Sequence, residues 1–155
     1  NKSIILTSGI LAANLVTSQY GFVDVTFSSN PTLTANTTYW SNGAEPTWPV
    51  DTSETYFMIT NDGSMSINVS ASSSNWTGGV GWTLGTPASN VSRLSVFKVG
   101  DNSTAGLVLT NSDQAWISSL GASSNTTWEL KFETPTAFTD GTLKTATITL
   151  TAVAS

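Results

Sequence analysis

The chain has 155 residues, enough for one domain with a single hydrophobic core. Charged residues make up only 10%, five Lys or Arg against ten Asp or Glu, for a net charge of −5, whereas Ser and Thr number 49. Without His or Cys, the sequence excludes Ser-His-Asp triads, thiol nucleophiles, Cys/His zinc sites and disulfides. A negative chain with one Arg also lacks a basic surface for nucleic acid. We therefore expect neither catalysis nor nucleic-acid binding.

The first predicted element is an uncharged apolar segment over residues 3–16. It is shorter than the roughly 20 residues of a membrane helix, so we expect no membrane span. Three interpretations remain: a central strand of its own sandwich, an amphipathic helix, which Gly9 disfavours, or a donor strand that adds to the sheet of a neighbouring subunit. In extended form both faces are apolar, with Ile4, Leu6, Ile10, Ala12 and Val16 on one and Ile5, Leu11, Ala13 and Leu15 on the other.

From residue 21 onward, apolar and polar side chains alternate, which is typical of half-buried strands. In the clearest case, 64–72, Met65, Ile67 and Val69 share the apolar face. Turns such as Asn61-Asp62-Gly63 separate the strands. We predict an all-β fold, an antiparallel β-sandwich or jelly roll (21–155) with an N-terminal extended donor-strand segment (1–20). The predicted strands are 22–27, 55–60, 64–72, 93–99, 106–110, 127–133 and 144–154.

Two stretches depart from this alternation. Residues 28–54 are rich in turn residues and indicate one long loop, within which we expect a strand around Thr32–Trp40, because long loops without secondary structure are unusual in compact domains. The run from Gln114 to Ile117 allows a short helical turn. Elsewhere no long stretch has helical periodicity, which favours a fold built from strands.

Glycosylation is indicated by Asn-x-Ser/Thr sequons, and we expect several of them to be occupied. Calcium is an open alternative, because turns such as Asp101-Asn102 could supply oxygen ligands, although none matches an EF-hand loop. We expect no other cofactor or metal. The sequons are at Asn1, Asn36, Asn68, Asn75, Asn90, Asn102 and Asn125.

Two blocks of sequence carry a family resemblance. The block from Tyr56 to Ala71, followed by Trp76, has the form Phe-x-Ile-Thr-Asn-x-Gly-Ser and then an alternating strand, and the chain closes with Trp128–Thr136, Asp140-Gly141 and a Thr-rich strand. These blocks resemble the TasA/camelysin-type matrix-fibre proteins and the archaeal bundling pili and threads.

The resemblance implies an extracellular, cell-surface filament for adhesion or biofilm cohesion. Its jelly-roll subunits would join head to tail by N-terminal donor-strand complementation, and identical filaments could bundle laterally. The donor strand would then use Ile4, Ile5, Leu6, Ile10, Leu11, Ala13, Leu15 and Val16.

Three alternatives stand beside a filament. A secreted carbohydrate-binding module would use exposed Trp faces, for which Trp40, Trp48, Trp76 and Trp82 lie in loop-like stretches. A virion or phage-tail protein would share the composition. A glycosidase would need two carboxylates, but we predict that Glu129 and Glu133 are solvated beside Lys131.

Overall fold

The computed structural model describes residues 33–55, 57–102, 106–139 and 144–155, and the backbone of short strands within the first 32 residues. All regular secondary structure in this part of the chain is β, without a helix. Accordingly, no described segment is a helix long and apolar enough to cross a bilayer. The prediction of an all-β fold is confirmed.

The strands are short at the N-terminal end and longer from residue 57 onward. In chain order they are β1 (Ile4–Leu6), β2 (Val16–Thr17), β3 (Tyr20–Val23), β4 (Val25–Phe27), β5 (Thr38–Trp40), β6 (Phe57–Asn61), β7 (Ile67–Ser73), β8 (Thr83–Leu84), β9 (Val91–Lys98), β10 (Leu107–Val108), β11 (Gln114–Leu120), β12 (Ser124–Glu133), β13 (Lys144–Ala146) and β14 (Ile148–Ala154).

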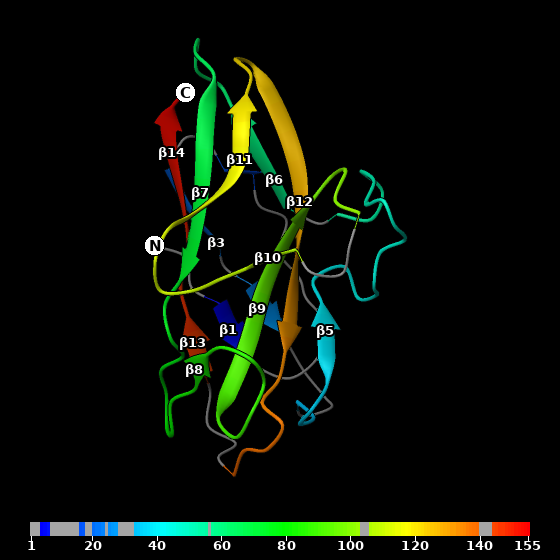
Figure 1. Ribbon diagram of the computed structural model, residues 1–155, viewed down its shortest axis with the longest axis vertical. Helices are drawn as coiled ribbons and strands as arrows, with labels where there is room; N and C mark the ends of the chain where they lie inside the picture. Colours follow the sequence, from blue (N-terminus) through cyan, green and yellow to red (C-terminus); the bar gives the residue numbers. More distant parts are fainter. Residues whose placement is uncertain are drawn as a thin grey trace.

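The strands form two main sheets that face each other as a sandwich (Figure 1). The larger has the order β10-β9-β12-β6-β2, with β5 added to β12 and β8 to β9. The smaller has the order β11-β7-β14-β3, and a short third sheet, β13-β1-β4, continues it. Most neighbours are antiparallel, but β1 is parallel to β4, β2 to β6 and β8 to β9. From β6 to β14, the longer strands alternate between the two sheets along the chain.

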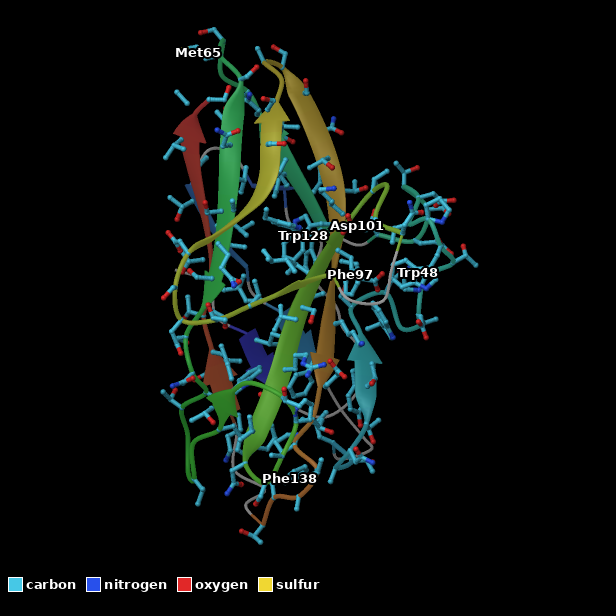
Figure 2. The ribbon with its side chains drawn as sticks, in the orientation of Figure 1. Trp48, Met65, Phe97, Asp101, Trp128 and Phe138 are labelled. Carbon is cyan, nitrogen blue, oxygen red and sulfur yellow. The ribbon has the colours of Figure 1, made fainter. Side chains whose placement is uncertain are left out.

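The core lies between these sheets and is rich in aromatic rings. The Trp128 ring, on β12, packs against Phe57 of β6 with the centroids 4.5 Å apart and the planes tilted by 31°, and it meets the edge of Trp116 of β11 at 5.5 Å. Trp76 donates a buried hydrogen bond from Nε1 to Ser92 Oγ at 2.6 Å. Figure 2 places Trp128 at the centre of the molecule. Strand alternation supplies the other core side chains, among them Val69, Ala71, Leu94, Val96, Leu130, Ile148 and Leu150.

A second, smaller cluster lies on the outer face of the larger sheet. Phe97 follows Val96 on β9 and therefore points to the opposite face, where Trp40 and Val50 cover it and Trp48 packs against them. Trp40 and Trp48 lie 5.2 Å and 5.5 Å from Phe97, measured between ring centroids. Figure 2 labels Trp48 and Phe97. The segment 41–55 thus folds over the sheet instead of extending into solvent.

This covering segment corrects the prediction for Glu129. Glu129 lies opposite Phe97 in the β12–β9 register and is 0% exposed, so it is not solvated. Its Oε1 accepts a hydrogen bond from the backbone N–H of Asn42 at 2.9 Å. Within the described structure, its Oε2 has no hydrogen-bond partner. Burial, together with the nearby Glu54 carboxylate, raises the pKa of Glu129 to about 7, and the hydrogen bond from Asn42 opposes this shift.

Most of the predicted strands agree with the structure, but 22–27 and 144–154 are each divided into two strands in different sheets, β3 and β4, and β13 and β14. A strand within 28–54 is confirmed as β5, Thr38–Trp40. The helical turn at Gln114–Ile117 is wrong, because these residues begin β11 and pair with β7 through two register shifts. The shifts place Trp116, Ile117 and Leu120 at a spacing that resembles a helix. The alternation also predicts Met65 on the buried face, but Met65 lies in the turn before β7 and is 61% exposed (Figure 2).

Candidate polymerisation site

The candidate site is formed by two chain segments that pair with each other at one end and separate at the other. β14 and β3 pair antiparallel, from Ile148 opposite Val23 to Thr151 opposite Tyr20. One residue before β14 lies β13, and one residue after β3 lies β4. β13 and β4 do not pair with each other in the described register, because β1 lies between them, antiparallel to β13 and parallel to β4. We call β13 and β4 the fork; β1 fills it.

The registers show that β1 bridges the fork completely. Ile5 lies opposite Thr145 on one side and opposite Thr26 on the other, and the residues before and after it are matched in the same way. A strand between two others can satisfy backbone donors and acceptors on both its edges. Removal of β1 would therefore expose unpaired edges on both β13 and β4.

The other edge of β13 is already occupied. Thr77 N donates to Thr145 O at 2.8 Å, and Thr145 N donates to Thr77 O at 2.9 Å. The two hydroxyl groups also lie 2.9 Å apart. Lys144 is 2% exposed, with Nζ 5.6 Å from the centroid of the Trp82 ring. These contacts fix β13 on the side of Thr77. Only its opposite edge can therefore pair with an added strand.

The structure places the predicted donor residues only in part. Ile4, Ile5 and Leu6 form β1, and Val16 begins β2, which pairs parallel with β6. Because these residues are extended, an amphipathic helix is wrong for 4–6 and 16–17. The central-strand and donor-strand interpretations share the same backbone pairing. Ile10, Leu11, Ala13 and Leu15 lie outside the described residues.

The sequons differ in how their side chains are placed. Asn68 and Asn90 are half-buried, and Asn68 Oδ1 accepts a hydrogen bond from Ser119 N at 2.9 Å. Asn1 lies outside the described residues. The exposed sequons are Asn36, Asn75, Asn102 and Asn125.

Acidic turn residues have local partners. Asp101 Oδ1 pairs with Lys98 Nζ at 3.1 Å, and its Oδ2 accepts a hydrogen bond from Lys98 N at 2.9 Å. Asp113 accepts a hydrogen bond from Ser72 Oγ. Nowhere in the described part of the chain do three acidic side chains gather at a point suited to a metal ion.

The tryptophans predicted to form sugar-binding faces are largely enclosed. Trp40, Trp76 and Trp82 belong to the two clusters of buried residues, and Trp48 is half-buried against Trp40 and Phe97. Trp76 and Trp82 pack with Phe132 instead of lining a loop tip. A binding face of stacked tryptophans is therefore not formed by these four residues.

No protein-family model, curated protein or solved structure matches this chain. The resemblance to donor-strand filament subunits accordingly depends on the sequence blocks alone.

Proposed function

We propose that the chain is the structural subunit of an extracellular filament for adhesion or cell-to-cell cohesion, assembled by N-terminal donor-strand complementation. In the filament, the segment 3–16 of one subunit would join the next subunit, with β1 in its fork. The observation that carries this proposal is the place of β1, which lies between β13 and β4 and is paired with both.

The parallel pairing of β1 with β4 favours an exchangeable strand. Parallel neighbours in one chain cannot be joined by a tight hairpin and need a long connection. Here, 18 residues separate β1 from β4, and the first nine of them (7–15) link β1 to β2. Fully extended, such a linker spans about 30 Å. β1 can therefore leave its own fork and enter that of a neighbour with the same register, as in domain swapping.

The geometry of exchange favours an open polymer. A donor strand and its fork are different surfaces of the subunit, so the contact is heterologous and repeats without closing. Burial of aliphatic side chains, at about 1.5–3 kcal/mol each, would contribute a gross term above about 10 kcal/mol per junction before ordering costs. Polymerisation would then stabilise a chain that has no Cys.

We also propose that the sandwich is of the jelly-roll type. The alternation of β6, β7, β9, β11, β12 and β14 between the two sheets supports this, since successive strands of a jelly roll cross between its sheets.

The test compares full-length chains by negative-stain microscopy and size-exclusion chromatography. Ile5→Asp and Leu11→Asp should abolish filaments while the chain stays soluble, because a buried charge in the donor strand is costly. Val153→Asp is the matched control: Val153 is 55% exposed on β14, and the variant should polymerise normally. A synthetic peptide of residues 1–20 should inhibit growth by filling free forks.

Two results would overturn the proposal. Normal filaments from Ile5→Asp would show that residues 3–16 do not join subunits. A wild-type chain that stays monomeric at every concentration would show that β1 closes only its own fork.

A further inference from the structure

A cleft of about 420 Å³ opens on the larger sheet. Its lining includes Arg93 and Ser95 of β9, which alternate with the core residues Leu94 and Val96 and therefore lie on the outer face. Lys131 and Glu133 of β12 lie beside them, opposite Ser95 and Arg93 in the strand register. Val108 of β10, Gly85 and Thr86 complete the lining.

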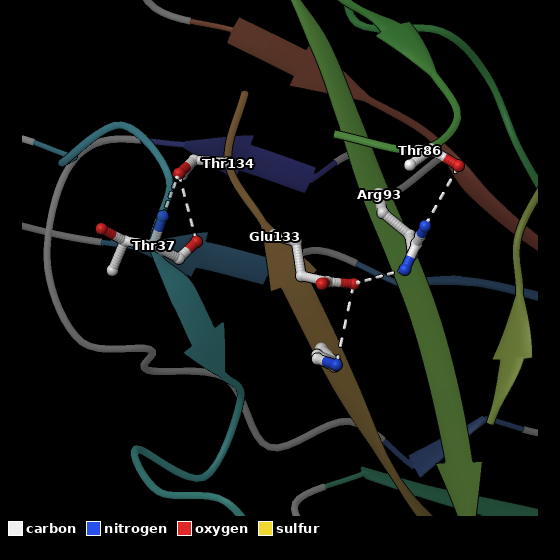
Figure 3. A network of polar contacts seen from close by, with 6 residues as sticks. Thr37, Thr86, Arg93, Glu133 and Thr134 are labelled. Atoms are coloured by element: carbon white, nitrogen blue, oxygen red, sulfur yellow. Dashed lines mark hydrogen bonds and ion pairs between the residues drawn. The ribbon is translucent and has the colours of Figure 1, made fainter. Parts of the chain in front are cut away.

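The charged groups of the cleft are only loosely paired. Glu133 Oε2 lies 3.5 Å from Arg93 Nη1 and 3.7 Å from Lys131 Nζ, both longer than a direct hydrogen bond (Figure 3). Arg93 Nη2 donates to Thr86 Oγ1 at 3.2 Å. Arg has five N–H donors and Lys three, so both cations keep donors for a ligand.

The local charge is opposite to that of the whole chain. The cleft joins two cations and one carboxylate, whereas the chain carries a net charge of −5 with only five cationic residues. The side chains are half-buried and reach the surface in part: Arg93 is 29% exposed, Glu133 20% and Lys131 15%. This favours a small anion that reaches both cations.

We propose that this cleft binds a carboxylated sugar, a hexuronate unit of an acidic polysaccharide. The sugar carboxylate would pair with Arg93 and Lys131, and its hydroxyl groups would exchange hydrogen bonds with Thr86 and Glu133. The volume lies within the range of small-ligand sites, about 300–1,000 Å³.

Glu133 makes a sugar a better match than an acidic peptide. The hydroxyl groups of a uronate can donate hydrogen bonds to the Glu133 carboxylate, whereas a chain of Asp and Glu side chains would bring only further negative charge. Neutral sugars lack the anion that the two cations select. Recognition here would use charge and hydroxyl groups instead of tryptophan stacking, and it is independent of polymerisation.

The experiment is a calorimetric titration of the full-length chain with trigalacturonate, with neutral galactotriose and hexaglutamate as parallel ligands. Arg93→Gln should weaken trigalacturonate binding by about tenfold, since it removes a charge-assisted pair. Lys98→Gln is the control: Lys98 is a cation on the same strand that lies outside the cleft and pairs with Asp101. Thermal unfolding must show that both variants are folded.

The expected result is binding of trigalacturonate alone, unchanged in Lys98→Gln and weakened by added salt. Equal affinity of the wild type and Arg93→Gln would overturn the proposal, as would no binding of trigalacturonate. Tighter binding of hexaglutamate would replace the sugar by an acidic peptide and also overturn it. If binding persists in the non-polymerising Ile5→Asp chain, the cleft is separate from the polymerisation site.

Discussion

Replacement of Glu129 by Gln should change how stability depends on pH. Burial raises the pKa of this carboxyl to about 7 from an ordinary value of 4.5. The folded chain therefore holds its proton more tightly than the unfolded chain does. Wild-type stability should accordingly fall as pH rises from about 4.5 to about 7, and then level off. The difference between the two pKa values corresponds to about 3 kcal/mol.

Gln cannot ionise and resembles the protonated carboxyl, so the stability of the variant should not fall in this way as pH rises. Relative to wild type, Glu129→Gln should gain about 3 kcal/mol of unfolding free energy between pH of about 4.5 and about 8. Because the comparison is between two pH values, any constant cost of the Gln amide cancels.

The assay is urea denaturation of both chains across this pH range. Glu45→Gln is the control, because Glu45 is exposed on the same covering segment, and its stability difference from wild type should stay small throughout. A stability difference for Glu129→Gln that does not change with pH would refute the reasoning. It would mean that Glu129 is hydrated in solution or ionised in a paired state.

Two further predictions concern two glycines with positive φ and the sequons. Gly106→Ala should lower stability by about 2–5 kcal/mol, because its φ is +53° and the new Cβ would lie 2.7 Å from the Phe97 ring. Gly43→Ala, at φ +86° with no atom within 4 Å of the new Cβ, should cost only the backbone strain, about 1–2 kcal/mol, and equal urea midpoints for the two variants would argue against the clash. For glycosylation, intact mass of the protein from its native source should exceed the sequence mass by glycan increments, and peptide mapping should place them at Asn36, Asn75, Asn102 and Asn125 before the half-buried Asn68 and Asn90. A mass equal to that of the bare chain would exclude this modification.

The fork also has a consequence for folding. β1 and β4 contact each other across 18 intervening residues, and β1 contacts β13 across most of the chain length. Contacts of such long sequence separation are slow to form within one chain. While the fork is open, its unpaired edges are available to any extended segment, including the N-terminal segment of a neighbour.

Much of the strand content could be predicted from local pattern alone. β7, β12 and β14 each alternate apolar and polar residues, and the alternation identified both the strands and most of their buried side chains. This works because a strand between core and solvent has a period of two in any fold. The absence of Cys and His likewise limits the possible chemistry through composition alone.

Other features depend on contacts between residues far apart in the chain. Glu129 belongs to a polar row on β12, and only the folding of 41–55 over that row buries it. The apolar spacing of β11 resembles a helix until its register shifts against β7 are known. Arg93 and Glu133 are 40 positions apart, and they meet because β9 pairs with β12. The sequence alone therefore determined most of the longer strands and the apolar character of the N-terminal segment, whereas tertiary pairing decided which polar groups are buried, where β1 lies and how the cleft is formed.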